Sequence, residues 1–249
     1  MSNFILKVRR AETPFFALLK SSAVALLRAR LPYPSFLKPL FRAAYGLHWT
    51  LYRSLHRAYV FIYAEPLFRG RCDRVGKRFF LWTLPDVRGH ARIEFGDDVT
   101  ITGKIAISSA RTFDSPRLVI GNRVNIGSGS SFIVSREIVV EDGVRIAGDC
   151  IVRDTDGHPR DPVSRLSGAP PASTEIKPVR ICRNAWIGRS STILKGVTVG
   201  ENAIVGTRSV VMIDVPAYAT VVGNPARVIL NPGPPQLASP ELTETGSGE

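Results

Sequence analysis

The chain has 249 residues, 44% hydrophobic and 22% charged, which is ordinary for a globular protein and enough to bury a sizeable core. Its net charge of +12 lies entirely in residues 1–80, which hold 15 Lys or Arg and three acidic residues. Residues 81–249 carry 18 of each sign, so two regions with different partners are expected. Three widely spaced cysteines without a CxxC pair exclude a disulfide framework and predict a reducing compartment.

The first third of the chain is predicted to be helical. Pro14 suits a first helical turn, with the helix running to about Arg30, and three prolines interrupt the pattern over residues 31–39. Between residues 40 and 62, apolar side chains recur at spacings of three and four, and Pro66 is expected to end this helix. Residues 1–70 are thus predicted to form a basic amphipathic helical region.

The basic helices allow more than one interpretation. They could pack on the neighbouring domain, or lie in a membrane surface with aromatic residues inward and Lys or Arg near anionic lipid. The charge favours the membrane surface over residues 1–64, at the cytoplasmic face. No uncharged run reaches the roughly 18–20 residues of a membrane span. Lys20 interrupts an otherwise signal-like start, so no cleavage is expected, and no nucleic-acid motif is present.

A six-residue period dominates residues 181–213. Every sixth position is aliphatic: Ile181, Ile187, Ile193, Val199, Val205 and Val211. Four places after most of these a small residue follows: Ala185, Ser191, Ala203 and Ser209, with Val197 the larger exception. A period of six predicts a parallel coil of short flat faces, each with one aliphatic side chain inside and small residues near the corners.

The same period begins near residue 71. It is seen in Ile93, Val99 and Ile105, in Ile120, Ile126 and Phe132, and in Val140, Ile146 and Val152. Cys150 falls in a small-residue position, so a packing role is expected. The domain is predicted over residues 71–230, and residues 81–230 leave room for roughly six or seven coils. The period vanishes over residues 153–178, which form a long excursion loop, and residues 231–249 are predicted to be a disordered tail.

The excursion loop holds the residues best suited to chemistry. His158 lies within the segment D-x-D-x-H-P, two residues after Asp156 and four after Asp154. An imidazole can take a proton near neutral pH, and a carboxylate can fix its tautomer. Alternatively, His158 is only a solvent-exposed loop residue. His48 and His56 fall on the basic helices, and His90 is expected to be structural.

Together, the hexads, the D-x-D-x-H-P segment and the motifs from Ala185 to Ala226 resemble the hexapeptide-repeat O-acetyltransferases of the maltose, nodulation-factor and colanic-acid type. The likeness covers about residues 71–230. It implies a mainly β fold, a left-handed parallel β-helix preceded by helices. It also implies a homotrimer, acetyl-CoA as co-substrate without a metal, and clefts between neighbouring coils that hold the acyl donor.

The resemblance also assigns roles to individual residues. His158 would be the general base that deprotonates the acceptor hydroxyl, with Asp154 or Asp156 orienting its ring. The oxyanion formed on the thioester would be held by a group that the sequence does not identify. The residues implied at the cofactor are Trp186, Gly188, Lys195, Gly206, Arg208, Ser209 and Arg227. Met212-Ile213-Asp214 departs from the family's usual Thr-Lys-Asp, which moves one phosphate contact to Arg208 or removes it.

The preferred function is therefore acetyl transfer to a sugar hydroxyl in cell-surface polysaccharide biosynthesis, in the cytoplasm or at the inner face of its membrane. One alternative is a coil that serves as a scaffold or ligand-binding protein without catalysis. A γ-carbonic-anhydrase-like enzyme needs three histidines at one metal, yet only His90 and His158 fall within the coil. The acceptor sugar and its hydroxyl cannot be named from the sequence.

Overall fold

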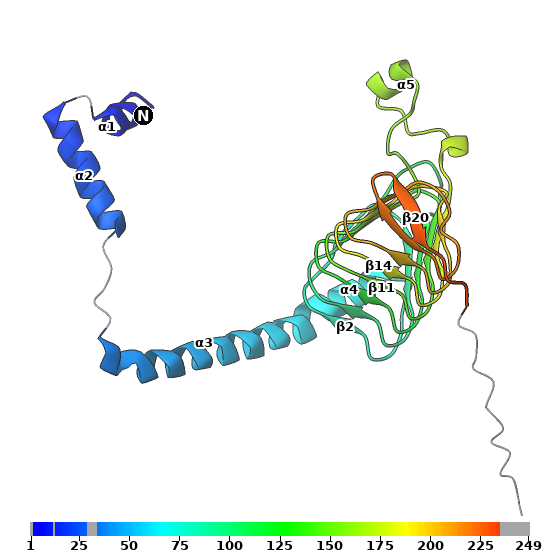
Figure 1. Cartoon of the computed structure of the whole chain (residues 1–249), viewed down its shortest axis with the longest axis horizontal. Coiled ribbons are helices and arrows are strands. Elements are labelled where there is room, and N and C mark those ends of the chain that lie inside the picture. Colours follow the sequence, from blue (N-terminus) through cyan, green and yellow to red (C-terminus); the bar gives the residue numbers. More distant parts are fainter. Residues whose placement is uncertain (1, 12, 29–33, 235–249) are drawn as a thin grey trace, which may run out of the picture. The chain divides into compact units, whose positions relative to one another are not determined.

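The computed structural model describes residues 2–11, 13–28 and 34–234. The chain divides into two compact units, Met1–Ser54 and Leu55–Glu249. Helices form the first unit, and the second contains the strands (Figure 1). Most of the tail predicted for residues 231–249 lies outside the described residues, which end at residue 234.

The first unit consists of α1 (Ser2–Arg10), α2 (Pro14–Arg28), the 3₁₀ turn η1 (Ser35–Leu37) and most of α3 (Lys38–Tyr59). The prediction of helices on both sides of the proline-rich stretch is confirmed. None of the residues of α2 and α3 whose burial is described is buried. Within the described part of the chain, no helix combines the length and apolarity that crossing a bilayer requires.

The second unit starts with the end of α3, the π-helical turn η2 (Val60–Ala64) and α4 (Glu65–Arg71). The prediction that Pro66 ends the helix is wrong. Pro66 lies in the first turn of α4, directly after the π turn, where its missing N–H is tolerated. Phe68 is buried, with its ring 6.0 Å from Phe79 and 5.6 Å from Phe95 (centroid distances), so α4 covers the first end of the coil.

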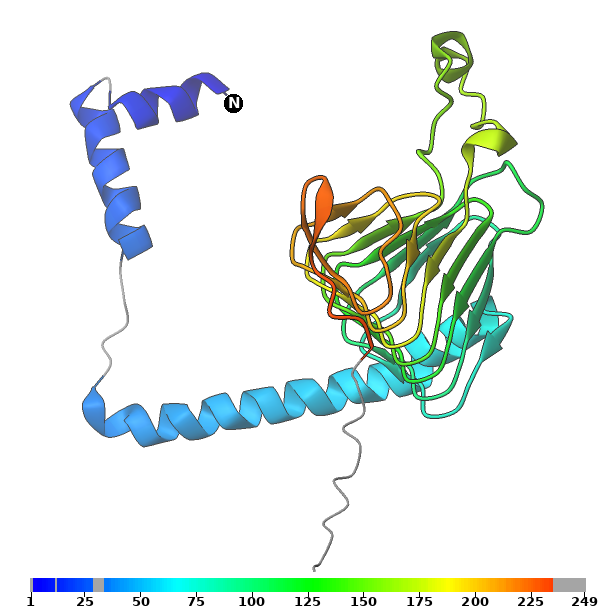
Figure 2. The same cartoon turned by 45° about the vertical axis from the view of Figure 1, so that its right-hand side comes forward.

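Three parallel sheets form the coil (Figures 1 and 2). Sheet A contains β1 (Arg74–Val75), β4 (Arg92–Phe95), β7 (Arg117–Ile120), β10 (Glu137–Val140), β13 (Val179–Ile181) and β16 (Thr198–Val199). Sheet B contains β2 (Phe80–Leu81), β5 (Thr100–Ile101), β8 (Asn125–Ile126), β11 (Arg145–Ile146), β14 (Trp186–Ile187), β17 (Ile204–Val205), β19 (Thr220–Gly223) and β20 (Ala226–Leu230). Sheet C contains β3 (Asp86–Arg88), β6 (Ala106–Ser109), β9 (Ser131–Val134), β12 (Ile151–Arg153), β15 (Thr192–Ile193) and β18 (Val210–Val211).

Each coil passes through sheets A, B and C in turn, and the strands from β1 to β18 make six such coils. The predicted hexad residues of 181–211 stack directly on one another. Ile181 lies beside Val199 in sheet A, and the pairs Ile187–Val205 and Ile193–Val211 follow in sheets B and C. All six side chains are fully buried. The predicted parallel coil is therefore confirmed in this region.

The hexad register predicted for the second coil is wrong by two residues. Phe95 pairs with Ile120, Ile101 with Ile126, and Ile107 with Phe132, so these three lie in the main aliphatic column. The predicted residues Ile93, Val99 and Ile105 lie two positions earlier, in the column that small residues occupy later in the chain. Both sets are buried because bulky side chains fill both columns in this coil.

The excursion loop leaves the coil after β12 and returns at β13. It contains the short helix α5 (Pro162–Leu166) and the 3₁₀ turn η3 (Ser173–Glu175), and it projects from the edge between sheets C and A (Figure 2). At the far end of the coil, β20 pairs antiparallel with β19. The coil is thus regular except where the loop that carries His158 emerges.

Candidate active site

The excursion loop is tied to the coil at its stem. The Lys177 N–H donates to the Asp154 carbonyl at 3.0 Å, and the Gly196 N–H donates to the Lys177 carbonyl at 3.0 Å. Further out, the Thr112 hydroxyl donates to the Pro171 carbonyl at 3.3 Å. The outgoing and the returning segment of the loop are therefore both anchored where they meet the coil.

His158 is exposed and follows Gly157, whose φ is +86°. Within the described part of the chain, its side chain makes no hydrogen bond or ion pair. Both ring nitrogens are thus available to a ligand. By contrast, a ring nitrogen of His90, Nε2, lies 2.9 Å from the Phe113 carbonyl oxygen, which agrees with a structural role for that residue.

Asp154 points away from His158 and into the coil. Its carboxylate is fully buried and accepts hydrogen bonds from the backbone N–H groups of Ser135, Arg136 and Glu137, at 2.7, 2.6 and 2.8 Å. Burial raises the pKa of this carboxyl, and the three N–H donors oppose the shift. The ring-orienting contact predicted for Asp154 is not made, because both carboxylate oxygens hold the turn after β9.

Asp156 faces Lys195, not the imidazole of His158. Its carboxylate forms an ion pair with the Lys195 ammonium group, whose side chain is only 15% exposed. Lys195 follows β15, so this pair joins the coil to the excursion loop. The ammonium group that was predicted to contact coenzyme A phosphate is thus paired with Asp156 in this structure.

Several residues predicted at the donor lie on another edge of the coil. Gly188 and Gly206 follow β14 and β17, between sheets B and C. A Cβ on Gly188 would lie 2.7 Å from the Val205 carbonyl oxygen, and one on Gly206 would lie 2.5 Å from Val222 Cγ1. Ser209 is fully buried and its hydroxyl accepts the Gly223 N–H at 3.1 Å. The Ser209 N–H also donates to Ser191 Oγ at 3.3 Å, and its carbonyl accepts the Thr192 N–H at 2.8 Å, so both its side chain and its backbone are hydrogen-bonded within the coil.

The larger side chains predicted to contact the acyl donor are exposed near this edge. Arg208 has a φ of +59° at the turn after β17, and Arg227 lies on β20 with one Nη donating to the Ala226 carbonyl at 2.9 Å. Trp186 is 53% exposed on the outer face of sheet B, between Arg145 and Ile204 in register. Two arginines and an indole are therefore presented to solvent beside the close-packed glycines.

The candidate residues thus form two groups on two edges of the coil. The base edge, between sheets C and A, carries His158, Asp156 and Lys195. The donor edge, between sheets B and C, carries Gly188, Gly206 and Arg208. Strands β12, β15 and β18 of sheet C separate the two edges within one chain.

The three cysteines are not suited to act as nucleophiles. Burial raises the pKa of Cys72 to about 12 and also raises the pKa values of Cys150 and Cys182, which keeps these thiols protonated near neutral pH. Cys150 is fully buried in the small-residue column, as its packing role predicts. Over the described residues, no group of three or more His, Cys, Asp or Glu side chains is arranged to hold a metal ion.

Comparison with known proteins points to transferases. Residues 178–212 match the family described as bacterial transferase hexapeptide (six repeats). The polysialic acid O-acetyltransferase of Escherichia coli O1:K1 is 37% identical over 117 residues, which are 45% of this chain and 36% of that protein. A Saccharomyces cerevisiae protein named as a candidate acetyltransferase is 36% identical over 112 residues, 42% of this chain and 55% of its own length. The chain thus spans between a third and about half of these relatives.

Among solved structures, AntD, an N-acyltransferase from Bacillus cereus in complex with dTDP-4-amino-4,6-dideoxyglucose and coenzyme A, is 22% identical. The superposition has a TM-score of 0.55 and covers 66% of this chain and 87% of that one. This likeness concerns the fold alone. Residues 178–212 therefore match a transferase hexapeptide family, and the chain resembles the hexapeptide-repeat O-acetyltransferases.

Proposed function

We propose that this protein is an acyl-CoA-dependent O-acyltransferase with a left-handed β-helix, which transfers acetyl from acetyl-CoA to a sugar hydroxyl of a cell-surface polysaccharide. One observation carries the proposal. The loop with the exposed, unpaired His158 leaves the coil directly before residues 178–212, which match the transferase hexapeptide family. A coil that served only as a scaffold would keep the hexads but would not need a D-x-D-x-H-P loop.

In the proposed reaction, His158 acts as the general base. One ring nitrogen accepts the proton of the sugar hydroxyl as that oxygen forms a bond to the acyl carbon. Acetyl-CoA supplies the acetyl group as a thioester. When the carbon–sulfur bond breaks, the imidazolium returns its proton to the sulfur, so the histidine ends the cycle neutral. Because no carboxylate of the described residues contacts His158, the group that orients the ring must come from the acceptor or from a second copy of the chain.

The donor edge fits coenzyme A in its chemistry. Gly188 is buried against the next coil, whereas Gly206 is partly exposed and offers backbone without a side chain to an extended chain such as pantetheine. The exposed guanidinium groups of Arg208 and Arg227 suit phosphates, which they can bind in a bidentate manner. Trp186 offers an apolar face beside them.

A homotrimer would unite the two edges. The base edge and the donor edge lie apart in one chain, so a complete site needs the donor edge of a second copy beside His158. Closed rings of identical subunits create such head-to-tail contacts, with the same site at each interface. We propose three copies, each contributing one edge to each of two sites.

The acceptor is proposed to be a polysaccharide or its lipid-linked precursor. The name of the E. coli relative supports the polysaccharide. Exposed apolar residues on α3, such as Leu47 and Leu51, together with neighbouring arginines, support a contact with the inner face of the cytoplasmic membrane.

Release of coenzyme A thiol in the presence of acetyl-CoA and a panel of bacterial polysaccharides tests the activity. The variant H158A should lose about a hundredfold or more in turnover, the contribution typical of general-base catalysis. H48A removes an exposed histidine from the first unit and is the matched control. Full activity in H158A, measured with an acceptor that the parent protein acetylates, would remove His158 from the mechanism.

A further inference from the structure

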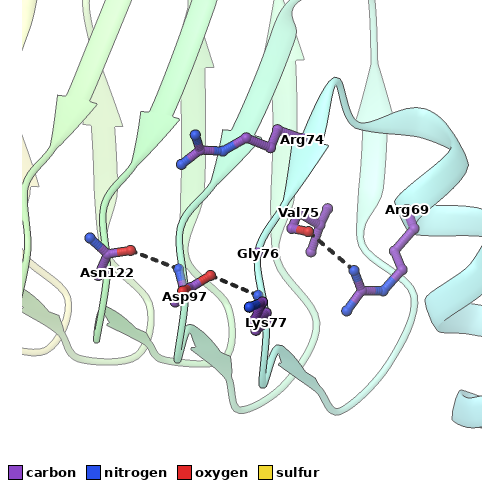
Figure 3. Close-up of a pocket in the computed structure, with 7 residues that line it drawn as sticks. All are labelled: Arg69, Arg74, Val75, Gly76, Lys77, Asp97 and Asn122. Carbon is purple, nitrogen blue, oxygen red and sulfur yellow. Dashed lines mark hydrogen bonds between the residues drawn. The ribbon is translucent and has the colours of Figure 1, made fainter.

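A basic pocket lies at the first coil, far along the sequence from His158 and the donor residues. Its volume is about 610 Å³, and it is lined by Arg69, Arg74, Val75, Gly76, Lys77, Asp97 and Asn122 (Figure 3). Helix α4 supplies Arg69, and strand β1 with the following turn supplies the next four. This size falls within the range of small-molecule sites.

Three cations line this pocket against one carboxylate. The Asp97 carboxylate accepts the Lys77 backbone N–H at 2.8 Å, so part of its hydrogen-bonding capacity is already used. Within the described part of the chain, the charged groups of Arg74 and Lys77 make no hydrogen bond or ion pair. Both side chains are exposed, which leaves two cationic groups available at the rim.

Arg69 is held in place by the protein. Its Nε donates to Glu65 Oε1 at 2.9 Å, one Nη donates to the Val75 carbonyl at 3.3 Å, and its guanidinium lies 5.7 Å from the Phe79 ring centroid. A guanidinium has five N–H donors, so those on the other Nη stay available. Fixing the group beforehand reduces the entropy that a ligand would have to offset.

The floor of the pocket is also fixed. A Cβ on Gly76 would lie 2.4 Å from both Asp97 Oδ1 and the Gly96 carbonyl oxygen, so no larger residue fits there. The Asp97 N–H in turn donates to Asn122 Oδ1 at 2.8 Å (Figure 3). These contacts join three successive coils, so the backbone that carries the cationic side chains at the rim is held in a fixed position.

We propose that this pocket binds a phosphate group, with Arg74 and Lys77 as its principal ligands and Arg69 as a third, fixed donor. Arg and Lys are the side chains best suited to phosphate, and hydrogen bonds between ionised partners are the stronger ones. The site is distinct from the two edges proposed for acetyl transfer and does not depend on that function. The phosphate can belong to a soluble compound or to a lipid headgroup.

Pyrophosphate binding to the full-length protein tests the site. Calorimetric titration at low ionic strength should give saturable binding that weakens about tenfold or more in R74Q/K77Q and also weakens in the presence of added salt. R92Q removes an exposed arginine of the next strand that does not line the pocket, so it should bind like the parent. Equal loss in R92Q, or no saturable binding by the parent protein, would overturn the proposal.

Vesicles separate the two sources of phosphate. Flotation with phosphatidylcholine vesicles containing phosphatidic acid is compared with flotation on phosphatidylcholine alone. If a lipid headgroup occupies the pocket, the parent protein and R92Q float with the phosphatidic acid vesicles and R74Q/K77Q floats less. Added pyrophosphate then reduces the flotation of the parent protein. A soluble ligand gives pyrophosphate binding that depends on Arg74 and Lys77, while flotation is the same for the parent and both variants.

Discussion

Lys195 on the coil forms an ion pair with Asp156 on the excursion loop, 39 residues earlier in the chain. The pair fixes the loop two residues before His158. The sequence predicts ring orientation for Asp156 and phosphate binding for Lys195. In the structure these two side chains instead pair with each other. This contact makes the position of the proposed base depend on the coil.

Breaking this pair should loosen the loop without unfolding the protein. Asp156 is 45% exposed, and ion pairs of this kind contribute about 0–1 kcal/mol, so the variant K195M should unfold close to the parent temperature. Hydrogen exchange over residues 155–178 should nevertheless become faster. Transfer activity should fall with kcat affected more than KM for acetyl-CoA, because the base is misplaced.

The reverse result would restore the role predicted for Lys195 at the donor. If K195M raised KM for acetyl-CoA and left exchange in the loop unchanged, the ammonium group would act on coenzyme A phosphate. The variant D156N is the matched control. It removes the charge of the partner while leaving Lys195 in place, so it should reproduce the faster exchange of K195M.

Asp154 should prove to be a structural residue. Replacing it with alanine leaves the N–H groups of residues 135–137 without their acceptor, at about 1–3 kcal/mol for each donor that stays buried. The variant D154A should therefore unfold at a markedly lower temperature, whereas H158A should unfold like the parent. Thermal unfolding followed by circular dichroism measures both. A D154A protein as stable as the parent but inactive would show that Asp154 acts in catalysis after all.

The stabilising contribution of Asp142 should depend on pH. Asn122 lowers the pKa of this carboxyl, chiefly through its side-chain hydrogen bond to Asp142 Oδ2 and also through its backbone N–H to Oδ1. A folded-state pKa below the unfolded value near 3.9 contributes stability above that value, and the contribution is lost as pH falls through the folded pKa.

The variant N122A tests this dependence. Its unfolding temperature should lie furthest below that of the parent above about pH 5, with the gap narrowing as pH falls below about 4. Unfolding temperatures measured for both proteins between pH 3 and 6 provide the comparison. A gap that stays constant over the whole range would mean that lost packing and the lost hydrogen bond from the Asp97 N–H, and not the pKa of the Asp142 carboxyl, cause the difference.

Sequence periodicity predicted the coil wherever one column is aliphatic and the other small, as in Ile187 and Ala185. It failed in the second coil because Ile93 and Phe95 are both bulky, so spacing alone could not tell which column each occupied. The sequence places Asp154 in the excursion loop. Its structural role was not predicted because the N–H groups that donate to its carboxylate lie 17 to 19 residues earlier in the chain. A repeated pattern could have revealed this role. The carboxylates of Asp97 and Asp142 also accept backbone N–H groups 20 residues earlier, in the preceding coil.

The separation of the two edges predicts complementation between inactive copies. H158A removes the base edge's histidine, and R208E reverses the charge of the exposed arginine at the donor edge, so each variant alone should have little activity. Mixed trimers formed by co-expression contain interfaces where an intact base edge meets an intact donor edge, about a quarter of the total if copies assemble at random. Activity of separately purified variants, before and after co-expression, provides the measurement. Mixed trimers with no activity, despite confirmed co-assembly, would place both edges of a site in one chain.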